Sequence, residues 1–317
     1  MPRESPAVAQ PLPRAPEPGG LGMLLPTFPQ RRSALPTASE LATTCRRAEA
    51  AGASALWACD HLFWHTPAVE CLTSVTIAAA ATEKATIGPC VLQLPLRNAT
   101  AVAKQVASLD HISAGRVVLG VGIGNHRMEY EAAGAGYEGR GRRLDEGIAE
   151  LRSAWASAAE DSRFRQLPPA SVPVWVGGSS EAALRRAARL ADGWVPLFVP
   201  PADYAVAMER LDKEAERAGR HPSQVERAIV VFVSVGGSDA QIRGLEWMSS
   251  LYSIAPAAFE RHLVSGDARS VARSLESFAE AGARHIAVFV TADDPLGQFE
   301  DLAGAFFELA DAREPAR

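Results

Sequence analysis

The residues in this sequence that are best suited to proton chemistry stand at the end of a short apolar run at 55–60. Asp60 ends the run and His61 follows it. A histidine gives or takes a proton near neutral pH, and an adjacent carboxylate can orient or tune it. The pair therefore suggests acid–base catalysis by His61. The structural alternative is an aspartate that caps a loop beside a histidine that is bonded to the backbone.

Glycine occupies every second position at the end of another apolar run, 116–124, at Gly120, Gly122 and Gly124. This spacing indicates a tight exit from a strand, or a backbone that must come close to another group. A dinucleotide fingerprint requires G-x-G-x-x-G at the start of a helix, and the next required position here is not glycine. We therefore set a Rossmann dinucleotide site aside.

A third candidate lies at Gly177, Gly178, Ser179 and Ser180, where two glycines and two serines lead directly into a segment with helical periodicity. Free N–H groups and the positive dipole end of a helix N-terminus suit a phosphate. The structural alternative is a serine that only caps the helix. One cap does not explain the two glycines, so we favour a phosphate site.

Strands and helices must position these three candidate sites. The sequence alternates short β-like runs with longer helical segments. The apolar runs occupy 20–25, 55–60, 85–93, 116–124, 172–178, 193–199, 228–236 and 285–291. Helical periodicity marks 40–52, 100–113, 141–156, 181–192, 203–219, 268–282 and 297–312. Strands that alternate with helices indicate βαβ units and parallel pairing.

Eight such units predict an α/β fold of the (β/α)8 TIM-barrel type, with extra helices between 236 and 285 before the last strand. A doubly wound open sheet is the alternative, although it would not normally need eight strands in a chain of this length. In a barrel the carboxyl ends of the strands share one rim, where chemistry takes place. The three candidates above would then lie on that rim.

Composition narrows the class of protein. The 317 residues carry a formal net charge of −5 and show no basic stripe, which argues against nucleic-acid binding. The most apolar segment, 75–92, is interrupted by Glu83 and Lys84, so we expect no membrane span. We expect a disordered Pro-rich tail at 1–19, a single barrel domain at 20–312 and a C-terminal tail at 313–317.

The cysteines follow no metal-binding spacing. None belongs to a C-x-x-C pair or has a companion pair of histidines, so we expect no metal site and reduced thiols in a cytoplasmic protein. They are Cys45, Cys59, Cys71 and Cys90.

Over 20–310 the sequence resembles the bacterial luciferase-like family of flavin and deazaflavin enzymes. The most specific segments are 108–134, 139–155 and 172–194. Within the family, ACDHLFW and ATIGPCVLQ are most similar to the branch that uses the deazaflavin coenzyme F420. The resemblance implies an oxidoreductase that transfers hydride between F420 and a small organic substrate. The flat ring of the cofactor would lie in the barrel mouth, against the glycine-rich end of the fourth strand.

The resemblance also implies roles for particular residues. His61, Asp60 and Glu129 are the expected catalytic residues. A non-prolyl cis peptide is expected at Cys90–Val91, behind the ring. The expected cofactor contacts are Trp64, Cys90, Val91, Gln93, Gly122, Gly124, Asn125, Gly177, Gly178 and Ser179.

Two features depart from the family pattern. Some dehydrogenases of this branch have a glutamate directly after the last glycine of the fourth strand, where this chain has Asn125, and Glu129 lies four residues further on. The segment 156–172 is also shorter than in many relatives, in which a longer hairpin helps to cover the substrate.

Other functions and partners remain open at this stage. One alternative is an FMN-dependent two-component monooxygenase of the same fold, and another is a flavin-binding protein without turnover. The resemblance further implies a homodimer, and a reductase partner that supplies reduced flavin or F420.

Overall fold

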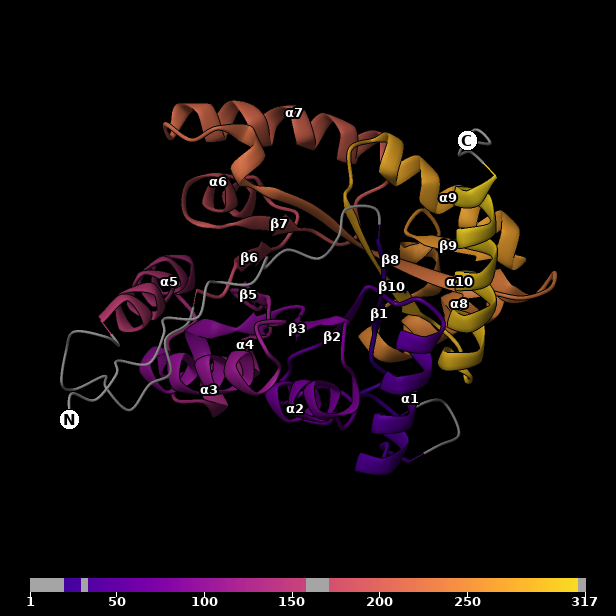
Figure 1. Cartoon of the computed structure of the whole chain (residues 1–317), viewed down its shortest axis with the longest axis horizontal. Coiled ribbons are helices and arrows are strands. Elements are labelled where there is room, and N and C mark those ends of the chain that lie inside the picture. Colours follow the sequence, from indigo (N-terminus) through magenta and orange to yellow (C-terminus); the bar gives the residue numbers. More distant parts are fainter. Residues whose placement is uncertain (1–19, 30–33, 158–170, 313–317) are drawn as a thin grey trace, which may run out of the picture.

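The apolar, β-branched runs form the parallel strands of one closed sheet, and helices surround it (Figure 1). The computed structural model describes residues 20–29, 34–157 and 171–312. The predicted tails at 1–19 and 313–317 lie outside these residues, as does most of the shortened segment at 156–172.

The strands close into a barrel in which neighbours run parallel. Their order is β3, β2, β1, β10, β8, β7, β6, β5 and β4. A parallel bridge between Ile87 and Val117 closes the sheet, and β3 and β4 together form one position of the barrel. The described residues therefore fill eight positions, which confirms the (β/α)8 prediction. The strands are β1 (Gly20–Leu24), β2 (Ala55–Ala58), β3 (Thr86–Pro89), β4 (Leu92–Gln93), β5 (Leu119–Gly122), β6 (Val174–Gly177), β7 (Gly193–Val195), β8 (Glu226–Val235), β9 (Leu263–Gly266) and β10 (His285–Val290).

Helices cover the outside of the barrel, and most of them lie in the segments whose helical periodicity predicts them. They are α1 (Ala38–Ala50), α2 (Cys71–Ala81), α3 (Ala99–Ile112), α4 (Arg127–Ala132), α5 (Arg140–Ser157), α6 (Glu181–Leu190), α7 (Pro201–Arg217), α8 (Ala240–Tyr252), α9 (Ala268–Glu280) and α10 (Pro295–Asp311). Three short 3-10 turns add η1 (Leu94–Leu96), η2 (Pro222–Gln224) and η3 (Pro256–Phe259) among the described residues.

Local sequence signals explain where several helices begin and end. The Thr37 hydroxyl accepts the Glu40 N–H, and the Glu40 carboxylate accepts the Thr37 N–H, so α1 starts on a capping box. Gly52 (φ +96°) and Gly219 (φ +72°) follow α1 and α7 closely in the left-handed conformation that glycine adopts without steric cost.

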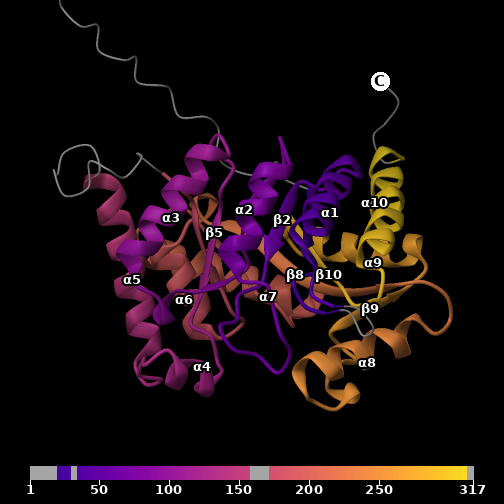
Figure 2. The same ribbon diagram turned by 90° about the horizontal axis from the view of Figure 1, so that it is seen from below.

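Two elements near the barrel mouth differ from the prediction. The strand β9 pairs with β8 beside the barrel path, where only helices were expected between 236 and 285. The short helix α4 lies in a glycine-rich segment that showed no helical periodicity. In Figure 2, α4 and α8 lie at the same end of the molecule. Trp64 in the loop after β2 donates a hydrogen bond to Leu251 of α8, so this loop meets the insertion that contains α8, η3 and β9.

Two hydrophobic layers stabilise the barrel. One layer packs the strands against the surrounding helices. The other fills the barrel interior with large aromatic side chains, among them Trp57 and Trp175, whose ring centroids are 5.5 Å apart. Because alternate side chains of a strand point to opposite faces, each strand supplies both layers. Burial of one such side chain contributes about 1.5–3 kcal/mol.

Candidate active site

His61 and Glu129 form a hydrogen-bonded pair at the carboxyl ends of β2 and β5. Nδ1 of His61 lies 3.1 Å from Oε2 and 3.3 Å from Oε1 of Glu129. The Glu129 side chain is fully buried, and that of His61 is 22% exposed. The sequence prediction grouped these two residues as catalytic, but it did not foresee that the carboxylate beside His61 is Glu129.

The surroundings of Glu129 favour its ionised form. Its Oε1 accepts the backbone N–H groups of Leu62 at 2.7 Å and Phe63 at 3.2 Å. Burial alone would raise the pKa of Glu129, but the hydrogen bond and charge of His61, with donors from Phe63 and Gln93, hold that pKa below its ordinary value. An ionised carboxylate only accepts hydrogen bonds, so it favours a proton on Nδ1 of His61.

The expectation that Asp60 acts directly on His61 is wrong. The Asp60 carboxylate accepts Nη2 of Arg97 at 2.7 Å and the backbone N–H of Gln93 at 2.8 Å. Neighbouring residues at a strand end point in different directions, which leaves Asp60 on the helix side of the barrel wall. Arg97 is a residue that the sequence analysis missed, because an isolated arginine after η1 carries no signal of a buried partner.

Gln93 links the two carboxylates behind His61. Its Nε2 donates to the backbone carbonyl of Asp60 at 2.9 Å and to both oxygens of Glu129 at 3.2 Å. The side chain is buried. Gln93 was expected to contact the cofactor, which stays a prediction; in the structure its amide group holds the carboxylate of Glu129.

Trp64 covers His61 on the side of the barrel mouth. The two rings stack with centroids 4.0 Å apart, and Nε1 of Trp64 donates to the Leu251 carbonyl in α8 at 2.9 Å. His65 and His126 also pack on Trp64, at 4.7 Å and 5.3 Å between centroids. The insertion thus holds the β2 loop in place over the His61–Glu129 pair, which we call the dyad. The sequence does not signal this contact.

The alternating glycines leave space for the chain itself. A Cβ atom on Gly122 would lie 2.6 Å from the Val91 side chain, and one on Gly177 would lie 2.8 Å from it. A Cβ atom on Gly124 would overlap Oε1 of Gln93. The close approach that the alternating glycines indicated is made, within the chain, by the third-strand side chains Val91 and Gln93, and a contact with a cofactor ring stays a prediction.

The peptide bond between Cys90 and Val91 is cis, as predicted. Both residues are half-buried and pack on the interior layer of the barrel, next to the strand ends that carry His61 and Gln93. Burial raises the pKa of the Cys90 thiol, so this group stays protonated at neutral pH. Cys90 and Val91 thus offer an uncharged surface at the mouth. All four cysteines, which lie within the described residues, are free.

The predicted phosphate site begins at Gly178, which has a φ of +106°. Ser180 caps α6, and its hydroxyl accepts the Ala183 N–H at 3.2 Å, so the capping interpretation holds for this serine. Among the described residues, the backbone N–H groups of Ser179, Glu181 and Ala182 have no hydrogen-bond acceptor. Free donors therefore remain at the helix start for an anion.

A cavity of about 470 Å³ opens beside Ser179, and Arg210 and Arg261 also line it. Arg210 pairs with Glu181 at 2.8 Å and Arg261 with Asp203 at 3.4 Å. The two arginines are thus each paired with a carboxylate, Glu181 or Asp203, that lines the same cavity. They were not among the predicted site residues, because they lie far from α6 in the sequence.

Asn125 does not take part in the dyad. It is exposed, and its backbone carbonyl accepts the Tyr137 hydroxyl at 3.2 Å. Helix α4 begins after His126, and Glu129 lies in its first turn. The Tyr130 hydroxyl donates to the Ile123 carbonyl and thereby fixes α4 to the end of β5. A carboxylate that contacts His61 thus lies one helical turn after Asn125.

Two other features are absent from residues 20–29, 34–157 and 171–312 of the structure. No group of three or more histidine, cysteine, aspartate or glutamate side chains there is arranged to hold a metal ion. Nor does any helix in these ranges have the length and apolar character needed to cross a membrane.

Comparisons with known proteins agree with this architecture. The chain is 30% identical over 165 residues to a phthiodiolone/phenolphthiodiolone dimycocerosates ketoreductase of Mycobacterium tuberculosis. The aligned segment covers 47% of this chain and 43% of that protein. The chain spans about half the length of the curated relatives it matches.

Solved structures of two kinds share the fold. An F420-dependent secondary alcohol dehydrogenase in complex with an F420–acetone adduct superposes with a TM-score of 0.75 at 19% identity, over 90% of this chain and 98% of the other. A long-chain alkane monooxygenase superposes with a TM-score of 0.73 at 13% identity, over 94% and 92%. The family model described as luciferase-like monooxygenase matches residues 20–245. This chain therefore belongs to the luciferase-like monooxygenase family.

Proposed function

We propose that this protein transfers hydride between the deazaflavin coenzyme F420 and a small organic substrate, with His61 and Glu129 handling the accompanying proton. The observation that carries the proposal is the 3.1 Å contact between Nδ1 of His61 and the buried carboxylate of Glu129, at the carboxyl ends of β2 and β5. Active sites of TIM barrels lie at this face.

The dyad is suited to moving one proton at a defined atom. With Nδ1 donating to Glu129, the other ring nitrogen of His61, Nε2, is left to exchange a proton with a substrate oxygen. The hydrogen bond from Nδ1 to Glu129 also holds the imidazole ring in place. Trp64 fixes the ring plane by stacking, and Gln93 with two backbone N–H groups fixes the carboxylate.

The residues at the mouth fit a cofactor with a flat ring and a phosphate. The free N–H groups of Ser179, Glu181 and Ala182 would hold the phosphate, and the uncharged bulge at Cys90 and Val91 would back the ring. The cofactor would supply the hydride. The protein would supply position, a proton donor and exclusion of water.

Side-by-side fluorescence titrations of the purified protein with F420 and with FMN test the proposal. We expect tighter binding of F420, and slow reoxidation of the reduced cofactor by air, because a reduced deazaflavin is a hydride carrier. Equal or tighter binding of FMN together with rapid oxygen consumption would instead support the FMN-dependent monooxygenase. Binding without any turnover would support a carrier protein.

The assembly of the protein is a further part of the proposal. We propose a homodimer and, for the reaction cycle, a partner reductase that regenerates the reduced cofactor in the cytoplasm. Sedimentation at micromolar concentration would contradict the dimer if it gave the mass of a single chain.

A further inference from the structure

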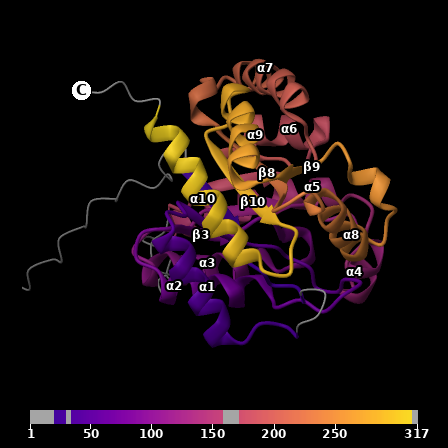
Figure 3. The same cartoon turned by 90° about the vertical axis from the view of Figure 1, so that its right-hand side faces the viewer.

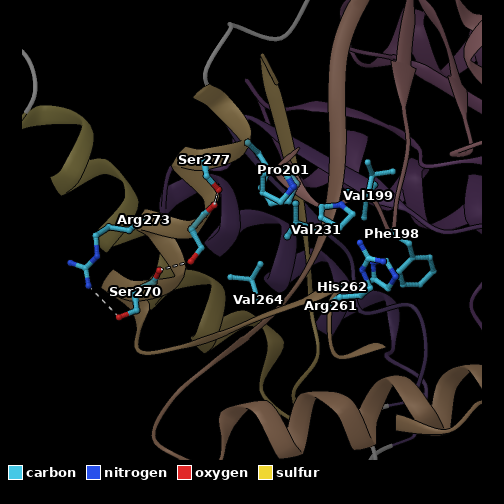
Figure 4. A pocket seen from close by; sticks show the side chains of 14 residues that line it. Phe198, Val199, Pro201, Val231, Arg261, His262, Val264, Ser270, Arg273 and Ser277 are labelled. Atoms are coloured by element: carbon cyan, nitrogen blue, oxygen red, sulfur yellow. Dashed lines mark hydrogen bonds between the residues drawn. The ribbon is translucent and has the colours of Figure 1, made fainter. Parts of the chain in front are cut away.

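A cavity of about 570 Å³ lies outside the barrel wall, between α7 and α9 (Figure 4). Figure 3 shows α9 between α7 and α10, where it packs on the outer side of β8 and β9. The volume is in the range of about 300–1,000 Å³ that small-molecule sites occupy. We call it the α7–α9 cavity.

The walls of the α7–α9 cavity are largely apolar. Val231, Val264 and Phe278 line it and belong to the layer between the barrel and its helices. Phe198 forms one end and stacks on Phe232 of the barrel interior, with centroids 5.0 Å apart. An apolar group of a ligand would therefore find a surface to bury against.

The polar side chains of the cavity are cationic or hydroxylic, and no carboxylate is among its described lining residues. In Figure 4, Arg273 and Ser270 lie at one end, and Arg261 and His262 lie at the other. Within the described residues, Arg273 hydrogen-bonds the Ser270 hydroxyl at 3.2 Å and forms no ion pair. Its guanidinium therefore keeps donors for an external anion.

His262 supplies a second, independent observation. Its Nδ1 is buried and has no hydrogen-bond partner among the described residues. A buried polar atom without a partner is costly, and most such atoms in folded proteins have one. A water molecule bound beside the ligand would satisfy it.

We propose that the α7–α9 cavity binds a small organic anion: a carboxylate or phosphate monoester that carries an apolar group. Arg273 would contact the anionic head, and the wall of Val231, Val264 and Phe278 would bury the apolar part. The cavity does not include His61 or Glu129, so this ligand would bind away from the dyad. The inference does not depend on which cofactor the barrel mouth takes.

Isothermal titration of the whole protein with phenyl phosphate tests the proposal, with phenol and inorganic phosphate as the two halves of the probe. We expect phenyl phosphate to bind at least about tenfold more tightly than either half, because charge and apolar contact act together. The variant Arg273→Gln should weaken its binding by about tenfold or more. Arg273 is exposed, so the variant should fold.

Two further variants locate the ligand. Arg269→Gln removes an exposed arginine of α9 that does not line the cavity, and should leave the affinity unchanged. Ser274→Phe places a ring in the cavity and should abolish binding. Unchanged affinity in Arg273→Gln, or no binding of phenyl phosphate at millimolar concentration, would overturn the proposal. So would a loss of binding in Gly178→Asp with full binding in Arg273→Gln, because the probe would then lie at the start of α6.

Discussion

The side chain of Val91 occupies the space that Gly122 leaves inside the barrel wall: a Cβ atom on Gly122 would lie 2.6 Å from Cγ2 of Val91. The same side chain faces Gly177, at 2.8 Å from an added Cβ. The glycines of β5 and β6 and the bulge after β3 therefore form one packing unit. This unit joins the strand ends that carry the dyad and the α6 site.

Gly122→Ala should destabilise the fold by about 1–3 kcal/mol, because the added methyl overpacks a filled site. Urea denaturation measures the change in the free energy of unfolding. Val91→Ala in the same chain should recover part of the loss, since it removes the two methyl groups in the way. If the losses of stability in Gly122→Ala and Val91→Ala simply add in the double variant, Val91 and Gly122 do not share this space.

Gly304 provides a matched control for that experiment. It lies within α10, and nothing comes within 4 Å of an added Cβ. Gly304→Ala should stabilise the protein by about 0.5–1 kcal/mol, because glycine is unfavourable inside a helix. If the change in the free energy of unfolding has opposite signs at Gly122 and Gly304, crowding determines the effect at Gly122 and backbone entropy determines the effect at Gly304.

The Arg97–Asp60 ion pair should contribute mainly through its burial. Its side chains are only 15% and 0% exposed. Arg97→Met leaves the Asp60 carboxylate buried without its cation, and should cost about 3–5 kcal/mol in chemical denaturation. Arg47→Met breaks the exposed pair with Glu300 and should cost less than about 1 kcal/mol. Similar costs in the two variants would mean that solvent reaches Asp60.

The sequence was sufficient for the barrel because periodicity and composition act locally. Runs of β-branched residues separated by amphipathic segments predict parallel units, and the strand ends then share a rim. Three features depended on contacts between distant segments and could not be predicted. These are the pairing of β9 beside β8, the burial of Arg97 against Asp60, and the contact between Trp64 and Leu251.

The pairing of His61 with Glu129 is another contact between distant segments that the sequence did not predict. His61 and Glu129 were each predicted as catalytic, but adjacency in the sequence suggested Asp60 as the partner. Glu129 reaches His61 because α4 begins after His126, in a segment whose many glycines hide its single helical turn. Short helices that tertiary contacts stabilise leave little signal in periodicity.

Gly178→Asp should weaken cofactor binding strongly while the protein stays folded. The new carboxylate would stand at the start of α6, beside the free N–H groups that would hold a phosphate. Because Gly178 has a positive φ, any side chain there is strained, and Gly178→Asn is the matched control without charge. Equal cofactor affinities of the two variants in fluorescence titrations would place the phosphate elsewhere.

Glu129 should make stability depend on pH on the acid side. Its pKa in the folded protein lies below the ordinary value of 4.5, so the ionised carboxylate stabilises the fold above that pH. This contribution is lost as the pH falls through the lowered pKa. The difference in unfolding free energy between wild type and Glu129→Gln should therefore shrink below pH 4.5. A difference that stays constant down to the acid transition would contradict it.

The role of His61 is the most direct test of the proposed chemistry. Hydride transfer to or from a carbon is accompanied by a proton change at a neighbouring oxygen, and some group must handle that proton. Glu129 is held ionised, the Cys90 thiol is held protonated, and Asn125 does not titrate. Among the residues predicted for the site, His61 is the group with a nitrogen left for the substrate.

His61→Ala should lower turnover by about 10²–10⁴-fold, the usual contribution of general acid–base assistance, while cofactor affinity changes much less. Single-turnover bleaching of the reduced cofactor, with any ketone that the wild type accepts, measures turnover. A fluorescence titration measures the affinity for the cofactor. His65→Ala removes an exposed histidine from the same loop and should retain turnover. Normal turnover in His61→Ala would make the pair with Glu129 structural. A parallel loss of binding and turnover would make His61 a cofactor contact, because a proton donor for the substrate should leave the affinity for the cofactor nearly unchanged.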